Sequence, residues 1–236
     1  MFTRKKTVWL YLAPGLLGLL AFYFVPFVWG MWFILTDGTI DNKFVGFQNY
    51  LDVWQNEIFQ LGLKNTLELS VLCAPVIFVL AFVLASLLRK RVAGDGFFRN
   101  ALLMPYLMPS SAMLIIWLLM FDYGGVINRF VVALGFTRVF WLEGAQLRVP
   151  IVLLYIWKNL GFSVVIFTAA LQAVPESLYE YAALEGAGFF RRQFSITLPQ
   201  ILPTAFLVFV LAMVNAFKIF KEVYVIGGAY PDESVY

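Results

Sequence analysis

The sequence predicts an all-helical integral membrane protein, built as a polytopic bundle with five membrane-spanning helices. Of its 236 residues, 62% are hydrophobic and only 13% are charged, against about 45–50% and about 25% in soluble domains. Because so few charges could not cover a soluble fold, the composition excludes a cytosolic enzyme, a disordered chain and a nucleic-acid-binding module. The apolar residues also gather in long runs, and a backbone inside a bilayer must satisfy its own hydrogen bonds, which favours helices.

Five apolar runs reach, with their flanks, the roughly 20 residues that a helix needs to cross a bilayer. They occupy residues 8–35, 67–88, 101–121, 149–174 and 201–223. The first run is far longer than the roughly 7–15 apolar residues of a cleaved signal peptide. We therefore expect it to be a retained span, with a kink at Pro26, because the proline ring interrupts helical hydrogen bonding.

Lysine and arginine are unevenly divided between the two sets of connecting segments. Segments 1–7, 89–100 and 172–200 carry nine of them, whereas the opposite segments carry five over longer loops. Since cytoplasmic loops collect positive charge, we expect the N-terminus and segment 172–200 to be cytoplasmic. Five spans then leave the C-terminus outside, and we expect the chain to be truncated before a sixth span.

Few residues could carry metal or nucleophilic chemistry. There is no histidine, and Cys73 is the single cysteine, so zinc sites, haem ligation, disulfides and a Ser-His-Asp triad are excluded, and no cofactor or metal is expected. Cys73 lies inside an apolar run, where we expect a small buried hydrophobic residue. Residues 51–63 can form an amphipathic helix on the membrane surface.

The most informative segment is 172–203, QAVPESLYEYAALEGAGFFRRQFSITLPQILP, between the fourth and fifth runs. It is long for a connection between adjacent helices, which usually takes about 2–8 residues. Pro175 and Glu176 favour the start of a helix that continues to Glu185, and Gly186 permits a break after it. One interpretation is an interfacial helix beneath the lipid headgroups, a position that suits the aromatic and arginine residues of this segment.

The spacing of this segment resembles the EAA loop of binding-protein-dependent ABC importer permeases. The loop pattern reads E-A-A, three residues, G, nine residues, I-x-L-P. The matching residues are Glu180, Ala182, Gly186, Ile196, Leu198 and Pro199. Tyr181 stands where the pattern has its first alanine. The stretches FVGFQNY, MPYLMPS and IWKNLGFSVVIF resemble the sugar-type branch, which includes maltose and glycerol-3-phosphate permeases, and the resemblance covers essentially the whole chain.

This resemblance implies the fold of a type I ABC importer permease in the cytoplasmic membrane of a bacterium. It also implies a second permease subunit of different sequence, two copies of an ABC ATPase subunit, an extracytoplasmic solute-binding protein and contact with lipid. The chain lacks the G-x-x-x-x-G-K-[ST] phosphate loop, so we expect it not to be an enzyme and the ATPase to hydrolyse ATP. The implied function is to form the membrane pathway for a sugar, an oligosaccharide or a related carbohydrate.

The resemblance also assigns roles within the loop. Glu180 would pair with a basic group beside a cleft on the ATPase, and Gly186 would allow the turn after the first helix. Ala182, Ala183 and Ala187 would give close packing. The surface anchors would be Phe189, Phe190 and Phe194, with lipid contact as the alternative. The remaining candidates for the ATPase-coupling loop are Ile196, Leu198 and Pro199.

Polar and aromatic residues in the fourth and fifth runs are candidates for the solute pathway, because a polar group in a bilayer is costly. Four of these candidates share one face of a helix by their i, i+4, i+7 and i+8 spacing. The candidates are Tyr155, Asn159, Phe162, Ser163 and Asn215. Helix–helix hydrogen bonds, or outward snorkelling of Lys158, are the alternatives. Lys218 and Glu222 are expected to form an i, i+4 ion pair.

Other functions stay open on the sequence. An ABC permease for glycerol phosphate, amino acids, phosphate or polyamines would carry the same loop. An ion-driven secondary carrier would place carboxylates or broken helices at the membrane midplane, and the runs show no central aspartate or glutamate. A structural membrane scaffold or receptor subunit would not need the EAA spacing.

Overall fold

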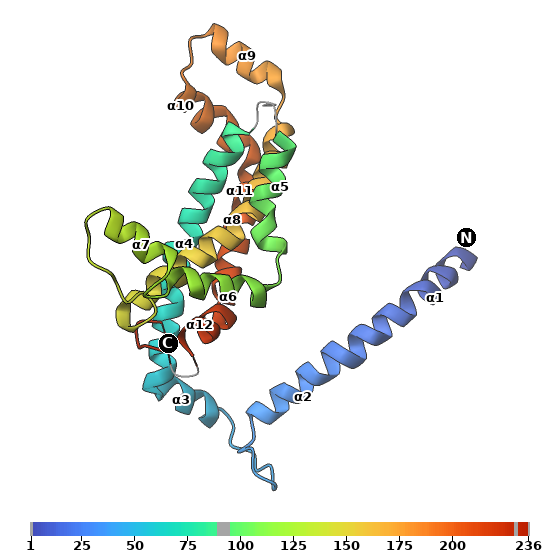
Figure 1. Cartoon of the computed structure of the whole chain (residues 1–236). Helices are drawn as coiled ribbons and strands as arrows, with labels where there is room; N and C mark the ends of the chain where they lie inside the picture. Colours follow the sequence, from blue (N-terminus) through green and yellow to red (C-terminus); the bar gives the residue numbers. More distant parts are fainter. Residues whose placement is uncertain (1, 89–94, 229–230, 236) are drawn as a thin grey trace. The chain divides into compact units, whose positions relative to one another are not determined.

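The computed structural model describes residues 2–88, 95–228 and 231–235, and those residues are organised mainly as helices (Figure 1). Among these described residues, five helical segments are long and apolar enough to cross a membrane, which confirms the predicted class of fold. The chain divides into two compact units, residues 1–60 and 61–236. Arg89, Lys90 and Arg91, on which the orientation argument partly rests, lie outside the described residues.

The first unit begins with one long helix made of three parts, α1 (Phe2–Leu19), a π-helical turn η1 (Leu20–Phe24) and α2 (Val25–Ile34). Within the turn the Val25 N–H bonds to the Leu20 carbonyl, five residues back. Pro26 follows directly and has no N–H to offer the preceding turn, so the widened turn accommodates the interruption. At Pro26, where we expected a kink, the structure has this π-helical turn directly before the helix that contains the proline.

A compact turn follows α2 and leads to α3 (Gln48–Gln55). The Asp37 carboxylate accepts hydrogen bonds from the Thr39 hydroxyl at 2.8 Å and from the Lys43 N–H at 3.1 Å, and the bond from Thr39 is the main reason that the pKa of Asp37 is lowered. The Asn49 side chain donates to the Ile34 carbonyl at 2.7 Å. The expected surface helix over 51–63 is wrong in its extent. The Asn56 side chain accepts from the Ile58 N–H and starts a new helix there, so 57–63 belong to α4.

In the second unit four helices run side by side: α4 (Glu57–Leu87), α5 (Asp95–Leu107), α8 (Arg148–Gln172) and α11 (Leu198–Ala216) (Figure 1). Helix α8 packs against both α5 and α11. The approach of α5 is close at Gly161, where an added Cβ would lie 1.8 Å from the Leu102 carbonyl oxygen. Phe167 of α8 meets the rings of Phe78 and Phe82 of α4 edge-on.

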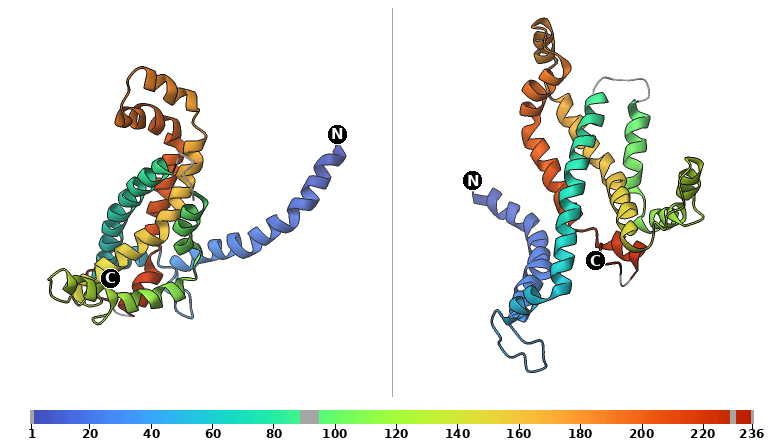
Figure 2. Two further views of the ribbon diagram at one scale, coloured as in Figure 1. Left: turned by 45° about the horizontal axis from the view of Figure 1, so that its top comes forward. Right: turned by 90° about the vertical axis from the view of Figure 1, so that its left-hand side faces the viewer.

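The single span expected over 101–121 is wrong, because the chain breaks at Pro109 into α5 and α6 (Ser110–Phe121). Proline lacks an N–H and disfavours helical backbone in the residue before it, so neither helix continues through this point. After the break α6, α7 (Val126–Ala133) and the short 3-10 turn η2 (Gly144–Leu147) lie toward one end of the bundle (Figure 2). The Asn128 side chain, fully buried, holds this region by donating to the Val139 carbonyl at 2.8 Å and accepting from the Val139 N–H at 2.9 Å.

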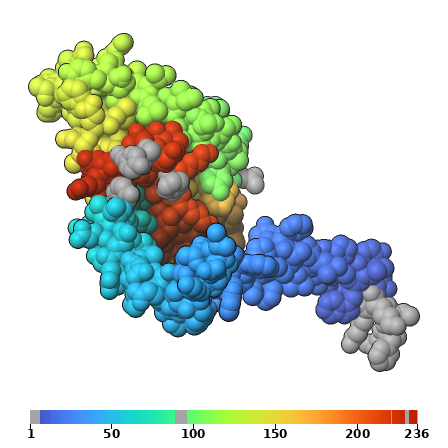
Figure 3. Space-filling model, turned by 90° about the horizontal axis from the view of Figure 1, so that it is seen from below, coloured from blue at the N-terminus to red at the C-terminus, as the bar shows by residue number. Residues whose placement is uncertain are grey.

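At the other end the chain forms α9 (Glu176–Leu184), a turn, α10 (Phe189–Arg192) and a second π-helical turn η3 (Gln193–Thr197) before α11. The last span is therefore longer at its start than the expected 201–223, since helix runs without a break over Phe189–Ala216. It is also shorter at its end. A turn after Ala216 leads to a separate helix, α12 (Phe220–Gly227), which reaches the surface at the end opposite α9, in red in Figure 3.

Buried side chains form two clusters in the second unit. One lies toward α6 and α12 and contains Cys73, which is fully buried as predicted. The other lies toward α9 and contains Ala81, Val164, Phe167 and Ile201. Each end of the bundle thus has its own core, and the two candidate sites lie at these two ends.

Candidate functional site

The loop between α8 and α11 is the first candidate site, and its central turn is built around Gly186. The Gly186 N–H bonds to the Ala183 carbonyl at 3.0 Å, and the Ala187 N–H bonds to the Ala182 carbonyl at 2.8 Å. These two bonds form a Schellman motif, which needs a left-handed residue at its centre. Gly186 has φ +72°, a conformation that a side chain would strain. The break expected at Gly186 is confirmed.

The tip of this loop presents apolar side chains to its surroundings. Leu184 is 85% exposed and Phe190 is 75% exposed, and Tyr181, Phe189 and Phe194 are exposed beside them. Glu180 and Ala183 are exposed as well, whereas Ala182 and Ala187 are half-buried. These candidates therefore lie together on a helix–turn–helix unit, whose exposed surface is apolar with Glu180 beside it.

The last residues of the loop pattern lie against the bundle, unlike the exposed tip. Ile196 and Leu198 are half-buried and pack against the core cluster that contains Phe167. Pro199 is exposed, about three turns into the long helix Phe189–Ala216. Since these three belong to a continuous helix, they fix the base of the loop to the bundle and are not part of its exposed tip.

The second candidate site is a polar cavity of about 400 Å³ between α8, α12 and the ends of α5, α6 and α11. It is lined by nine residues, which are Tyr106, Ser110, Tyr155, Lys158, Asn159, Asn215, Lys218, Ile219 and Glu222. Its charged and amide groups lie inside an otherwise apolar bundle. Such groups are costly to bury unless they are paired or used.

An ion pair crosses this cavity from α8 to α12. Lys158 Nζ lies 2.5 Å from Glu222 Oε1, and the two side chains are 19% and 10% exposed. Lys158 also donates to the Ser110 hydroxyl at 3.2 Å. The expected pairing of Glu222 with Lys218 is therefore wrong. Lys218 lies in the turn between α11 and α12, whereas Glu222 lies in α12. Because the two residues are not in one continuous helix, their i, i+4 spacing does not bring the side chains together. Lys158 does not snorkel outward.

Three of the five pathway candidates line the cavity: Tyr155, Asn159 and Asn215. The Tyr155 hydroxyl donates to the Ala212 carbonyl at 2.8 Å, and Asn159 donates to the Tyr155 carbonyl at 2.9 Å. The other two, Phe162 and Ser163, are not among the lining residues. Phe162 stacks on Tyr106 with ring centroids 4.8 Å apart, and Ser163 is buried with its hydroxyl 3.4 Å from the Asn159 carbonyl.

Sequence reasoning missed Tyr106, Ser110 and Glu222 as cavity residues. Tyr106 and Ser110 lie on either side of the break at Pro109. That proline could have indicated a break in the helix, and therefore that side chains near the two helix ends line a cavity. No local signal marks Glu222, because its partner Lys158 is 64 residues away in the sequence.

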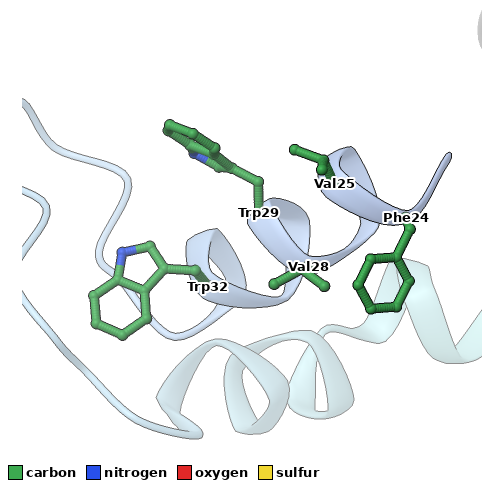
Figure 4. Close-up of a pocket in the computed structure, with 5 residues that line it drawn as sticks. All are labelled: Phe24, Val25, Val28, Trp29 and Trp32. Carbon is green, nitrogen blue, oxygen red and sulfur yellow. The ribbon is translucent and has the colours of Figure 1, made fainter. Parts of the chain in front are cut away.

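A third hollow, on the first unit, is a weaker candidate. It has a volume of about 410 Å³ and is lined by Phe24, Val25, Val28, Trp29 and Trp32. Figure 4 shows these side chains spread along one stretch of helix, with no charged group among them. An open apolar surface of this kind fits lipid or another helix better than a polar solute.

The fold and these two sites define a polytopic membrane protein with a polar cavity in its bundle and an exposed apolar loop at one end. A family model described as "Binding-protein-dependent transport system inner membrane component" matches residues 77–232. The chain belongs to this family of inner membrane components.

Named relatives support the assignment. The chain is 31% identical over 236 residues to the trehalose/maltose transport system permease protein MalF of Thermococcus litoralis, covering 98% of this chain and 80% of the relative. It is 31% identical over 179 residues to the sn-glycerol-3-phosphate transport system permease protein UgpA of Yersinia pestis, covering 75% of this chain and 61% of the relative. The chain thus spans less than two thirds of the length of that relative.

The fold also matches a solved structure. The crystal structure of a bacterial ABC transporter involved in the import of the acidic polysaccharide alginate contains a chain with a TM-score of 0.86 and 23% identity, covering 99% of this chain and 81% of that one. This likeness confirms the fold of an ABC importer permease, the class expected from the sequence.

Proposed function

We propose that this chain is the permease subunit of an ATP-driven importer, which forms a membrane pathway for a carbohydrate and couples it to a separate ATPase. The main observation behind this proposal is the helix–turn–helix loop, which turns at Gly186 through two backbone hydrogen bonds and exposes apolar side chains at its tip. An exposed apolar patch on a built scaffold is typical of a protein interface. The family membership supports an ATPase as the occupant.

Coupling follows from the way in which the loop is fixed to the bundle. When ATP closes the ATPase dimer, the docked loops of two permease subunits move with it. Because the second half of the loop is continuous with α11, that motion re-packs the spans between inward-open and outward-open states. In this proposal Glu180 pairs with a basic group on the ATPase, and the N-terminus and the loop are cytoplasmic. A second permease of different sequence and an extracytoplasmic binding protein complete the complex.

The polar cavity supports the carbohydrate part of the proposal. Asn159 and Asn215 offer amide donors and acceptors to hydroxyl groups, and Tyr106 and Tyr155 offer ring surfaces. The relatives named for trehalose/maltose and for glycerol-3-phosphate favour a hydroxylated solute. Glycerol phosphate is the second candidate, since Lys218 also lines the cavity.

Co-purification tests the coupling role. The chain, extended through its natural stop codon where one follows, is co-expressed with its neighbouring genes and pulled down. We expect an ATPase subunit to be retained with the wild type and released by Gly186→Leu and by Glu180→Lys. Gly188→Leu is the matched control, because Gly188 has extended backbone and its added Cβ would meet no atom within 4 Å. An inserted wild-type chain that retains no ATPase would refute the proposal.

Uptake into proteoliposomes tests the solute. Labelled trehalose, maltose and glycerol-3-phosphate are supplied with the cognate binding protein. We expect Asn159→Ala and Asn215→Ala to reduce uptake while the ATPase stays bound, and Lys221→Gln, outside the cavity, to leave uptake unchanged. Full uptake by both asparagine variants would remove the cavity from the pathway.

A further inference from the structure

Two hydroxyl groups join the coupling loop to the last span inside the protein. The Tyr179 hydroxyl of α9 lies 2.8 Å from the Thr197 hydroxyl at the end of η3. Tyr179 is 7% exposed and Thr197 is 1% exposed. A hydrogen bond between buried groups is exchanged for water only when the segment opens, so it opposes separation of the two elements.

A second hydrogen bond extends this contact. The Thr197 hydroxyl donates to the Arg192 carbonyl, five residues back, at 3.3 Å. A hydroxyl has one proton to give and two lone pairs to accept with, so Thr197 accepts from the Tyr179 hydroxyl whenever it donates to Arg192. The carbonyl of Arg192 lies at the start of the π-helical turn, and the Thr197 side chain therefore ties α9 to the part of the helix that departs from regular geometry.

The other end of α9 is tied to the same helix. Arg192 Nε donates to the Ala187 carbonyl at 2.8 Å, just after the glycine turn. Helix α9 is thus held to the long helix Phe189–Ala216 at two points, by Tyr179 near its middle and through the chain beyond its C-terminus. Two attachments prevent α9 from pivoting about Gly186 alone.

We infer that the Tyr179–Thr197–Arg192 network is the strut that makes the coupling loop and α11 move as one body. Tyr179 and Thr197 are positioning residues. Both side chains are buried, whereas those of the tip are exposed, and they transmit displacement of the tip to the span. This inference rests on the proposed function, and it names the residues through which the loop acts. The π-helical turn beside Thr197 supports it, because such turns frequently occur at functional sites.

Conservative variants test the strut in the full reconstituted complex. Tyr179→Phe keeps the ring and its packing but removes the bond to Thr197, and Thr197→Val keeps the shape but removes that bond and the one to Arg192. Loss of a buried hydrogen bond shifts an equilibrium by roughly two- to tenfold. We therefore expect the ATP hydrolysed per solute imported to rise by roughly that factor in Tyr179→Phe and by more in Thr197→Val, with the ATPase still bound.

The double variant sharpens the test. Adding Tyr179→Phe to Thr197→Val should produce no further rise, because the shared bond is already absent. Tyr50→Phe is the matched control, since Tyr50 lies on α3, outside the coupling loop, and is 52% exposed. A ratio of ATP to solute in Tyr179→Phe equal to that in Tyr50→Phe and the wild type would overturn the inference and leave the proposed function standing.

Amide hydrogen exchange gives a second measurement that does not depend on transport. We expect the amides of α9 to exchange roughly two- to tenfold faster in Tyr179→Phe than in the control Tyr50→Phe. Equal exchange in the two variants would also overturn the strut. A wild-type complex without ATP-dependent transport would instead refute the proposed function, and the inference would fall with it.

Discussion

The two ends of the bundle depart in opposite ways from the usual arrangement, in which apolar side chains are buried and charged side chains are exposed. The loop end presents Leu184 and Phe190 outside the bundle, and the cavity end buries Lys158 and Glu222 inside it. An exposed apolar side chain contributes little to folding but is ready to bind a partner. A buried charge depends on its partner for the stability of the fold. Substitutions at the cavity should therefore lower stability, and substitutions at the tip should lower affinity for a partner.

Removal of one charge of the ion pair is the largest expected effect on stability. Lys158→Met leaves Glu222 buried without its partner, which costs about 3–5 kcal/mol. The measurement is denaturation of the purified protein in detergent. Replacement of both residues by methionine should recover most of this loss, because no charge is then left unpaired. Lys221→Met, an exposed lysine one residue from Glu222, is the control, and equal loss in the two single variants would contradict the comparison.

The close contact between α5 and α8 predicts the next effect. Gly161→Ala places a methyl group against the backbone of Leu102, so the helices must separate, at a cost of about 1–3 kcal/mol. The same denaturation assay measures it. Gly188→Ala at the loop end should leave stability unchanged because its surroundings are open. Unaltered stability in Gly161→Ala would show that α5 and α8 are not tightly packed there.

A smaller effect is expected where a single buried hydroxyl joins two helices of the cavity. Tyr155→Phe removes the bond from the hydroxyl to the Ala212 carbonyl, at a cost of about 0.5–1.5 kcal/mol. Tyr181→Phe, at the loop tip, should cost nothing measurable. If both variants are as stable as the wild type, the Tyr155 hydroxyl does not stabilise the contact between the two helices.

The smallest change in stability, and the largest change in binding, is expected at the loop tip. Phe190→Ser should alter stability by less than about 0.5 kcal/mol, as exposed substitutions usually do. It should weaken retention of the ATPase by about thirtyfold, the effect of removing an aromatic anchor worth about 2 kcal/mol. Quantitative pull-down measures this. Phe136→Ser, equally exposed at the other end of the bundle, should retain the ATPase, and release by both variants would mean that the tip is not a specific surface.

The sequence predicted the loop better than the cavity, and the reason is the range of the interactions. The bonds around Gly186 connect residues three to five apart, so local spacing was enough to indicate the turn. The cavity is assembled by contacts such as Lys158 with Ser110, 48 residues apart. The break at Pro109 divided an apparently continuous apolar run, because hydropathy measures burial in lipid but not backbone geometry.

The class of protein could be read from the amino-acid sequence, because apolar runs of this length predict membrane helices in a bilayer that offers the backbone no hydrogen-bond partners. The turn at Gly186 could be read from it too, since one glycine satisfies a local backbone requirement. The pairing of Glu222 with Lys158 and not with Lys218 comes instead from the packing of the helices. The same packing places Phe162 and Ser163 outside the cavity lining and brings Tyr179 to Thr197. These outcomes depend on how helices distant in the sequence pack together, and helical periodicity records only which residues share a face.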